Sequence, residues 1–525
     1  MNKQKADRKI LTIISILASI FVYTGAIGIY FYANGWRLDP INQQVIKTGV
    51  LTVESEPFLA NLYIEGEDKG RTPRSESLTV GSYDISVYKT GYIEWKKNIQ
   101  IKEEKSTPVF PWLIRDNIEK QNIFSLEDRK YINSWINETN DHLLILTSQQ
   151  LVISGTYKYE LWRFDINTAF WDLSSNPRVV LTFDSATQEN ISMTIAPNGT
   201  LAVMRSENAE ATNYYLVDTS KTSTLETLTQ LDIGAFSSYT ISWSKDNNYL
   251  MFESPSDIIS FNIERQTKYL LYKKQVGYEY IWSTDEHGFF YGITPNIENT
   301  NENIYAYTMT QTLMDGSNPK IILSDLYFQK NAEYIERYRG DTGDGKYIPF
   351  TNSPESTKSV GKLLSFTVNQ NGNGIYIKSD AASYWYDINL KKYYLISSYS
   401  SDLIEFSIDN RKLIFKDSEG YSVFTFDKEQ GDHTEDLGSK KIANIDTNAS
   451  NVQWLSNSTY ISYIEDSTMY ISDKDGDNKV KILDNVDLFK YIGVTFSKEF
   501  VFTVQVGDTN EAGLNSITAD SYLIH

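Results

Sequence analysis

A loose repeat runs through the chain from about residue 120 to its end. Each copy has an aromatic or apolar residue, a short polar turn rich in Asp, Asn or Gly, an apolar strand and a second aromatic strand. The clearest copies are 195–203, 243–252, 282–290 and 406–415, and weaker ones start at Trp135, Phe366, Trp454 and Phe496. A period of about 40–50 residues with four short strands is typical of β-propeller blades. The repeat therefore predicts a propeller over 120–525 with about seven blades, six or eight being the alternatives.

One spacing in this series is too long for a single blade. Trp282 and Phe366 are 84 residues apart, which predicts an insertion near 326–360 that includes an exposed Asp/Gly loop at 341–345. The aromatic residues that open each copy are expected to be core, because buried aromatic side chains dominate β-rich cores. The turns at 243–248, 314–319 and 473–478 resemble those of TolB-like and WD-type propellers. That resemblance implies a fold and leaves the function open.

The composition agrees with an all-β fold. The chain has 37 Tyr, 24 Phe and 10 Trp, residue types that favour strands. It has no cysteine, which excludes disulfides, thiol chemistry and cysteine-based zinc sites. The formal net charge of −19 argues against binding nucleic acid through bulk electrostatics.

An uncharged run covers residues 10–32 near the N-terminus. As a helix it would be about 34 Å long, against about 30 Å for the hydrocarbon core of a bilayer. Lys3, Lys5, Arg8 and Lys9 precede it, so the positive-inside rule predicts a cytoplasmic tail at 1–9 and an extracytoplasmic remainder. A cleaved signal peptide is the alternative, but its apolar region is shorter and ends in small residues. We therefore expect a single transmembrane helix at 10–32, followed by a linker at 33–48.

Residues 49–115 alternate apolar and polar positions between Gly and Pro turns. The pattern predicts a small β-sandwich with strands near 49–55, 61–66, 82–89, 93–101 and 109–114. The order of its turns resembles that of the PEGA domain. The matching segments are 57–60 (Pro-Phe-Leu-Ala), 63–66 (Tyr-Ile-Glu-Gly), 70–73 (Gly-Arg-Thr-Pro), 81–83 (Gly-Ser-Tyr) and 91–92 (Gly-Tyr).

One motif departs from that family. The central Glu-Gly of the tetrapeptide that gives the family its name is replaced by Phe58-Leu59. The resemblance implies a surface module of membrane-anchored bacterial proteins that contacts envelope material or neighbouring proteins. A rigid spacer that separates the C-terminal body from the membrane is the equal alternative.

One acidic turn has the composition of a calcium loop. Asp473, Asp475 and Asp477 have the spacing that opens an EF-hand loop, but position 12 is Asp484 where the loop needs Glu. The flanking residues read as strands, so a tight turn between two strands is expected. A weak calcium site is the alternative, which calorimetry with calcium would test.

Other signatures of catalytic or metal-binding sites are missing from the sequence. The four histidines, His142, His287, His433 and His525, are not paired at metal-ligand spacing, and His287 is expected in a surface turn. No nucleophile elbow, P-loop or dinucleotide fingerprint occurs. We therefore assign no catalytic, cofactor-binding or metal-ligating residue.

These observations favour a non-catalytic cell-envelope protein. The helix would hold it in the bilayer of the cell membrane, and the propeller would bind a protein or glycan partner outside. An envelope enzyme that processes glycans with acidic residues in the propeller channel is the alternative function.

Overall fold

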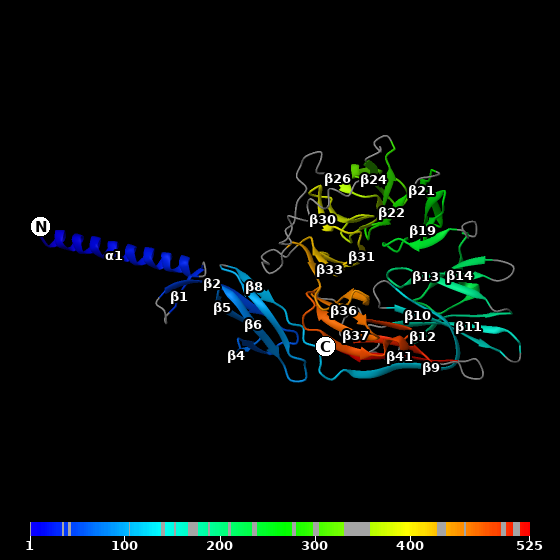
Figure 1. Cartoon of the computed structure of the whole chain (residues 1–525), viewed down its shortest axis with the longest axis horizontal. Coiled ribbons are helices and arrows are strands. Elements are labelled where there is room, and N and C mark those ends of the chain that lie inside the picture. Colours follow the sequence, from blue (N-terminus) through cyan, green and yellow to red (C-terminus); the bar gives the residue numbers. More distant parts are fainter. Residues whose placement is uncertain are drawn as a thin grey trace. The chain divides into compact units, whose positions relative to one another are not determined.

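The computed structural model describes residues 2–33, 36–39, 44–103, 105–137, 142–151, 154–165, 177–186, 189–207, 212–233, 239–275, 280–297, 304–329, 358–427, 437–455, 458–494, 500–507 and 515–524. The chain divides into two compact units, one built from the N-terminal residues up to Asn117 and the other from most of the remainder. Figure 1 shows the helix and the strands of both units.

The N-terminal unit begins with one long helix, α1 (Asn2–Ala33). The helix predicted over 10–32 is thus present, and it also includes most of the predicted tail at 1–9, because no helix-breaking residue separates the basic residues from the apolar ones. Within the described part of the chain, no helix combines the length and the apolar character that crossing a bilayer requires.

Two sheets form the predicted sandwich at 49–115. The first contains β1 (Trp36–Asp39), β2 (Gln44–Val53), β5 (Arg74–Thr79) and β8 (Ser106–Val109), and the second contains β4 (Glu67–Arg71), β3 (Asn61–Ile64), β6 (Gly81–Tyr88) and β7 (Trp95–Ile101). Leu51, Val53, Leu62 and Val87 are completely buried. Gly49 is needed in β2, because a Cβ atom there would lie 2.3 Å from the carbonyl oxygen of Lys102.

Three details of this domain differ from the prediction. The strands β4 and β5 were not predicted, because they are largely exposed and have no apolar alternation. The fifth predicted strand, at 109–114, is instead β8, which ends at Val109. The predicted linker at 33–48 contributes β1 and the start of β2 within its described residues.

The C-terminal unit is a β-propeller of four-stranded antiparallel blades. Blade 1 contains β9 (Glu119–Ile136), β10 (His142–Gln150), β11 (Tyr157–Asp165) and β12 (Arg178–Ser185); blade 2 contains β13 (Asn190–Ile195), β14 (Leu201–Glu207), β15 (Thr212–Asp218) and β17 (Thr229–Gln230); blade 3 contains β18 (Thr240–Trp243), β19 (Tyr249–Glu253), β20 (Asp257–Asn262) and β21 (Thr267–Lys273); blade 4 contains β22 (Ile281–Thr284), β23 (Phe289–Pro295), β24 (Ile304–Leu313) and β25 (Lys320–Gln329).

The other half of the propeller repeats this arrangement. Blade 5 contains β27 (Leu363–Val368), β28 (Gly374–Ser379), β29 (Ser383–Asp387) and β30 (Lys392–Ser397); blade 6 contains β31 (Asp402–Phe406), β32 (Lys412–Asp417), β33 (Gly420–Thr425) and β34 (Gly438–Lys441); blade 7 contains β35 (Ser450–Trp454), β36 (Tyr460–Glu465), β37 (Thr468–Asp473) and β38 (Val480–Asp484). Two short strands, β16 (Ser223–Thr224) and β26 (Lys358–Val360), add in parallel to β12 and β25.

An eighth blade joins the two ends of the propeller. It contains β39 (Tyr491–Val494), β40 (Phe500–Val506) and β41 (Asn515–Leu523), and β41 pairs with the first part of β9. The second part of β9 pairs with β10, so this 18-residue strand belongs to both blade 8 and blade 1. In Figure 1 the red C-terminal strands accordingly lie beside the cyan β9.

The described residues form eight blades, which is one of the two alternatives to the expected number of about seven. Eight repeat starts are visible in the sequence, and each of the seven described ones lies in the first strand of its own blade or at the end of that strand. The long spacing between Trp282 and Phe366 contains blade 4 and the connection to blade 5. Most of the predicted insertion, with the loop at 341–345, lies outside the described residues, as does the repeat start Phe496, whereas 326–329 and 358–360 are strand residues.

The hydrophobic core lies between neighbouring blades. One cluster joins Met309 and Phe328 of blade 4 to Phe366 and Tyr384 of blade 5. Another joins blade 8 to blade 1, where Phe164 and Phe502 stack with ring centroids 5.1 Å apart. Among the residues that open the repeats, the ones that are buried are Trp243, Phe366 and Trp454, and the ones that are partly buried against core clusters are Trp135, Ile195, Trp282 and Phe406. The prediction that they belong to the core is confirmed for these seven.

Candidate functional site

The turns between the first and second strands of the blades share one geometry. In six blades the fourth turn residue has a left-handed backbone and donates its N–H to the carbonyl of the first, at 2.8–3.4 Å. The left-handed residues are Gly199, Asn247, Gly288, Gly372, Asn410 and Ser458. Gly and Asn are the residues that adopt this conformation most readily. The polar repeat turns of the sequence are therefore confirmed as tight turns, and they fix which side chains reach the surface at the blade junctions.

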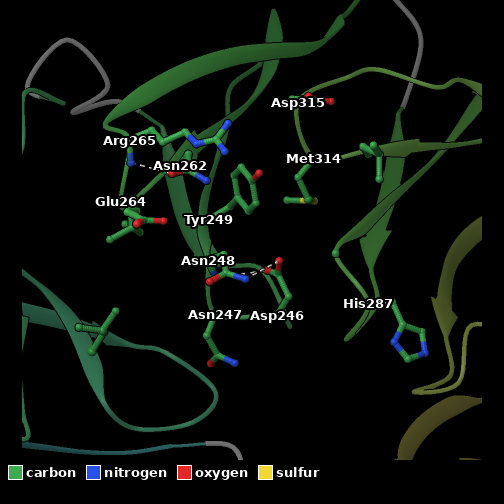
Figure 2. A pocket seen from close by; sticks show the side chains of 14 residues that line it. Asp246, Asn247, Asn248, Tyr249, Asn262, Glu264, Arg265, His287, Met314 and Asp315 are labelled. Carbon is green, nitrogen blue, oxygen red and sulfur yellow. Dashed lines mark hydrogen bonds between the residues drawn. The ribbon is translucent and has the colours of Figure 1, made fainter.

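A cavity of about 490 Å³ lies where the turns of blades 3 and 4 meet. Its lining comes from four turns and one residue of blade 2, and consists of Leu201, Asp246, Asn247, Asn248, Tyr249, Asn262, Ile263, Glu264, Arg265, His287, Gly288, Leu313, Met314 and Asp315. Figure 2 shows Tyr249 in the middle of the group, with Arg265 and Asn262 on one side and Met314 and Asp315 on the other. We refer to it as the turn cavity.

Hydrogen bonds within the turns hold several lining residues in place. Asp246 accepts hydrogen bonds from the backbone N–H of Asn248 at 3.3 Å and from its side-chain amide at 3.1 Å, and also from Ser244 Oγ. Asn247 accepts the backbone N–H of Asn198 of blade 2 at 2.8 Å. Gly288 of blade 4 faces Asp246, since a Cβ atom at Gly288 would lie 3.0 Å from the carboxylate. These contacts hold the turns that line the cavity in place.

A buried carboxylate positions the histidine at the rim. Asp285 is 1% exposed and accepts the backbone N–H of His287 at 3.0 Å and the hydroxyl of Tyr291 at 2.9 Å. Burial, together with the charge of Asp285, raises the pKa of the Tyr291 hydroxyl, so that it stays a hydrogen-bond donor. The His287 side chain is exposed in its turn, which confirms the prediction that it is a surface turn residue.

The exposed acid Asp315 remains ionised in the cavity. The hydroxyl and the backbone N–H of Ser317 donate to its carboxylate and, with the nearby charge of Arg265, hold the pKa of Asp315 below its usual value. The cavity thus offers anionic groups, a guanidinium group, amides and a tyrosine ring within one hollow, which suits a polar ligand rich in hydrogen-bonding groups.

The acidic turn at 473–478 is the expected connection between two strands. Asp473 ends β37 and accepts the backbone N–H groups of Asp475 at 3.0 Å and Asp477 at 2.9 Å. Asp475 forms an ion pair with Lys440 at 2.7 Å, and Asp484 forms one with Lys481 at 2.9 Å. Nowhere in the described parts of the chain do three acidic or histidine side chains gather as metal ligands.

A second cluster of titratable groups joins blades 1 and 2. Arg163 is 5% exposed and donates to Asp165 at 2.6 Å, to the carbonyl of Gly199 at 3.1 Å and to Thr219 Oγ1. These bonds join β11 of blade 1 to two residues of blade 2, so this cluster holds the two blades together. His433 and His525 lie outside the described residues.

Sequence reasoning identified the turns that line the cavity but not the cavity itself. The turns at 243–248, 282–288 and 314–319 were all singled out as repeat features. Glu264 and Arg265, in the turn between β20 and β21, were missed. The signal for them was the polar Asn-Ile-Glu-Arg-Gln segment between two apolar strands, but only the packing of adjacent blades brings it beside the other turns.

Comparison with known families identifies the small sandwich. Residues 48–113 match the PEGA domain family. This match covers the small sandwich and confirms the resemblance seen in its turns. No curated protein matches the chain.

Solved structures similar to the chain include several propellers at low identity. An oligogalacturonate lyase from Vibrio parahaemolyticus is 8% identical, with a TM-score of 0.37 over 74% of this chain and 98% of the lyase. The β-propeller domain of the Trilobed protease from Pyrococcus furiosus is 11% identical, with a TM-score of 0.35 over 69% of this chain and 97% of that domain. Hsv2 from Kluyveromyces lactis is 9% identical, with a TM-score of 0.35 over 76% of this chain and 98% of Hsv2. Similarity at this level carries no information about activity.

Proposed function

We propose that the protein is a non-catalytic binding protein of the bacterial cell envelope, and that its turn cavity binds a neutral saccharide chain. The observation that carries this proposal is the lining of that cavity. Carboxylates and amides such as Asp246 and Asn248 accept and donate hydrogen bonds to hydroxyl groups, and the ring of Tyr249 offers an apolar face. The net charge of −19 disfavours polyanionic ligands at long range, which makes a neutral chain the better match.

The state of the cavity acids favours binding over catalysis. A general acid that cleaves a glycosidic bond needs a raised pKa. The pKa of Asp315 is instead lowered by its hydrogen bonds to Ser317, and Asp246 is occupied by the turn that it stabilises. An envelope enzyme acting on glycans is therefore the weaker alternative.

The side chains of α1 support a role for this helix as the membrane anchor. Phe21 is 79% exposed, Tyr23 is 72% exposed and Ile29 is 70% exposed. Their neighbours Ile16, Leu17, Ile20, Val22, Ile27 and Tyr30 are exposed as well. A helix that is apolar on all sides requires an apolar environment, and the basic residues before it favour retention of the N-terminus in the cytoplasm. In this proposal the PEGA module follows the anchor outside the membrane and the propeller presents the cavity.

Calorimetric titration of the full chain in detergent tests the binding proposal. The probes are neutral oligosaccharides, beginning with a tetramer of N-acetylglucosamine, and unrelated tetrapeptides serve as the comparison. We expect saturable heat with a saccharide only. Arg265→Ala should weaken the affinity about ten-fold or more, because a lost hydrogen bond to a charged group costs about 1.5–3 kcal/mol.

Lys221→Ala is the matched control for this experiment. Lys221 is a cation in the equivalent turn of blade 2, it pairs with Asp218, and it lies outside the cavity lining. Its replacement should leave the affinity unchanged. An absence of heat with every saccharide, or equal losses in both variants, would contradict the proposed site.

A further inference from the structure

The PEGA module presents an apolar tip in place of its family's usual turn. Phe58 is 65% exposed and Leu59 is 60% exposed, between Pro57 and Ala60. Phe110 lies at the same end of the domain and is 53% exposed; the residue after it, Pro111, accepts the backbone N–H of Glu56 at 2.9 Å. Large apolar side chains gathered at one end of a small domain indicate a contact surface.

The backbone of the tip is held rigidly in a conformation that does not suit leucine. Leu59 has a φ of +62°, in the left-handed region that favours glycine, the residue of the family motif at this position. Its N–H donates to the carbonyl of Thr72 at 3.1 Å, and the ammonium group of Lys89 donates to the carbonyl of Phe58 at 2.6 Å. A strained residue that contributes nothing to the core indicates a role in binding and not in folding. Because the backbone of the tip is already ordered, binding there costs less conformational entropy.

Charged groups of both signs surround the apolar side chains. Arg71 lies opposite Asn61 across the β3–β4 pair, two residues beyond Leu59, and Glu54 precedes the tip. Within the described residues, Arg71, Lys89 and Glu54 form no ion pair. In a two-fold symmetric dimer the same surface of each copy must complement itself. An apolar centre with charges of both signs around it meets this requirement, because each charge can face the opposite charge of the other copy.

The distribution of charge along the chain favours this module as the place where copies meet. Residues 36–117, which follow α1, carry 11 Lys and Arg against 12 Asp and Glu, whereas residues 118–525 carry 34 against 55. The propellers of two copies therefore repel each other, while the N-terminal modules do not. A lipid surface is the poorer occupant for the tip. The helix α1 comes before β2 and the tip comes after it, so the length of this strand, about 33 Å, separates the tip from the helix.

We propose that Phe58, Leu59 and Phe110 form a self-association surface through which two copies of the protein pair by their PEGA modules. The contact is small and weak on its own. Two copies held in one membrane would meet at a high effective concentration, which strengthens such a contact. The cavity of the propeller is not part of this surface, so the pairing is independent of the saccharide proposal.

Sedimentation of the full chain in detergent, over a range of concentrations, measures the pairing directly. The unaltered protein should shift from monomer to dimer as its concentration rises. Leu59→Gly should raise the dissociation constant at least ten-fold while leaving the thermal midpoint within about 2 °C or raising it, because glycine relieves the left-handed backbone. Leu390→Ser is the control, since Leu390 of the propeller is also 60% exposed, and it should not change the dimer.

Disulfide trapping provides a second measurement in membranes. The chain has no cysteine, so a single introduced cysteine can form a disulfide only between two copies. Phe110→Cys should yield covalent dimer on mild oxidation, and Val80→Cys, exposed in the turn between β5 and β6, should yield several-fold less. A monomer at every concentration, a dimer unaffected by Leu59→Gly, or equal trapping at both cysteines would overturn the proposal.

Discussion

At the scale of single residues, the arginine cluster between blades 1 and 2 shows how a buried charge becomes part of the architecture. Burial alone would raise the pKa of Asp165, but hydrogen bonds from His142 and Arg163 and the charge of Arg163 lower it to about 2. Arg178 adds a second guanidinium group at 3.5 Å. The carboxylate is thus stabilised in its charged form in the folded protein, whereas unfolding restores an ordinary carboxyl group.

This shift predicts how stability depends on pH. The folded pKa of Asp165 lies below its unfolded value, so its contribution is complete above about pH 4–5 and is lost as the pH falls toward 2. Asp165→Asn should lower the free energy of unfolding by about 2 kcal/mol near pH 6, and this difference should shrink toward pH 2–3.

Chemical denaturation at a series of pH values measures the effect. Asp484→Asn is the control, because Asp484 forms an exposed pair with Lys481 and should contribute little. A loss of stability in Asp165→Asn that is the same at pH 6 and pH 3 would show that the carboxylate charge is not responsible.

At the scale of elements, β9 determines how the propeller closes. Its residues pair with β41 over Glu119–Arg129 and with β10 over Lys130–Ile136. Phe164, Phe502 and Ile517 pack together where the two blades meet. Because strands from opposite ends of the unit form blade 8, no continuous stretch of sequence contains all four of its strands.

The pairing of β9 with β41 predicts that the junction of blades 8 and 1 is sensitive to substitution. Ile517 is fully buried between blades 8 and 1, so Ile517→Ala should cost about 2–5 kcal/mol of stability. Hydrogen exchange should also speed up in β9 and β41 more than in blades 3 to 5.

Ile408→Ala serves as the control, because Ile408 is 43% exposed in a turn of blade 6. It should change the stability by less than about 0.5 kcal/mol. Equal exchange in all blades of the Ile517 variant would contradict the closure through β9.

At the scale of the whole molecule, the sequence repeat predicts the propeller but does not predict the turn cavity. The blades can be recognised from Trp243, Phe366 and Trp454. Each of these residues precedes a polar turn and an apolar strand, and both features depend on the local sequence alone. A number of seven blades is too low because a long connection follows blade 4 and because blade 8 takes its fourth strand from β9. The turn cavity could not be predicted, because Arg265 and Asp315 meet only through the packing of two blades.

The proposal places α1 in the membrane and everything after it outside. Protease added to intact cells, followed by detection of a C-terminal tag, tests this claim most directly. We predict that the tag is lost from intact cells while a short N-terminal fragment containing α1 stays with the membrane. Survival of the tag until the cells are opened, or recovery of the whole chain in the soluble fraction, would contradict the account.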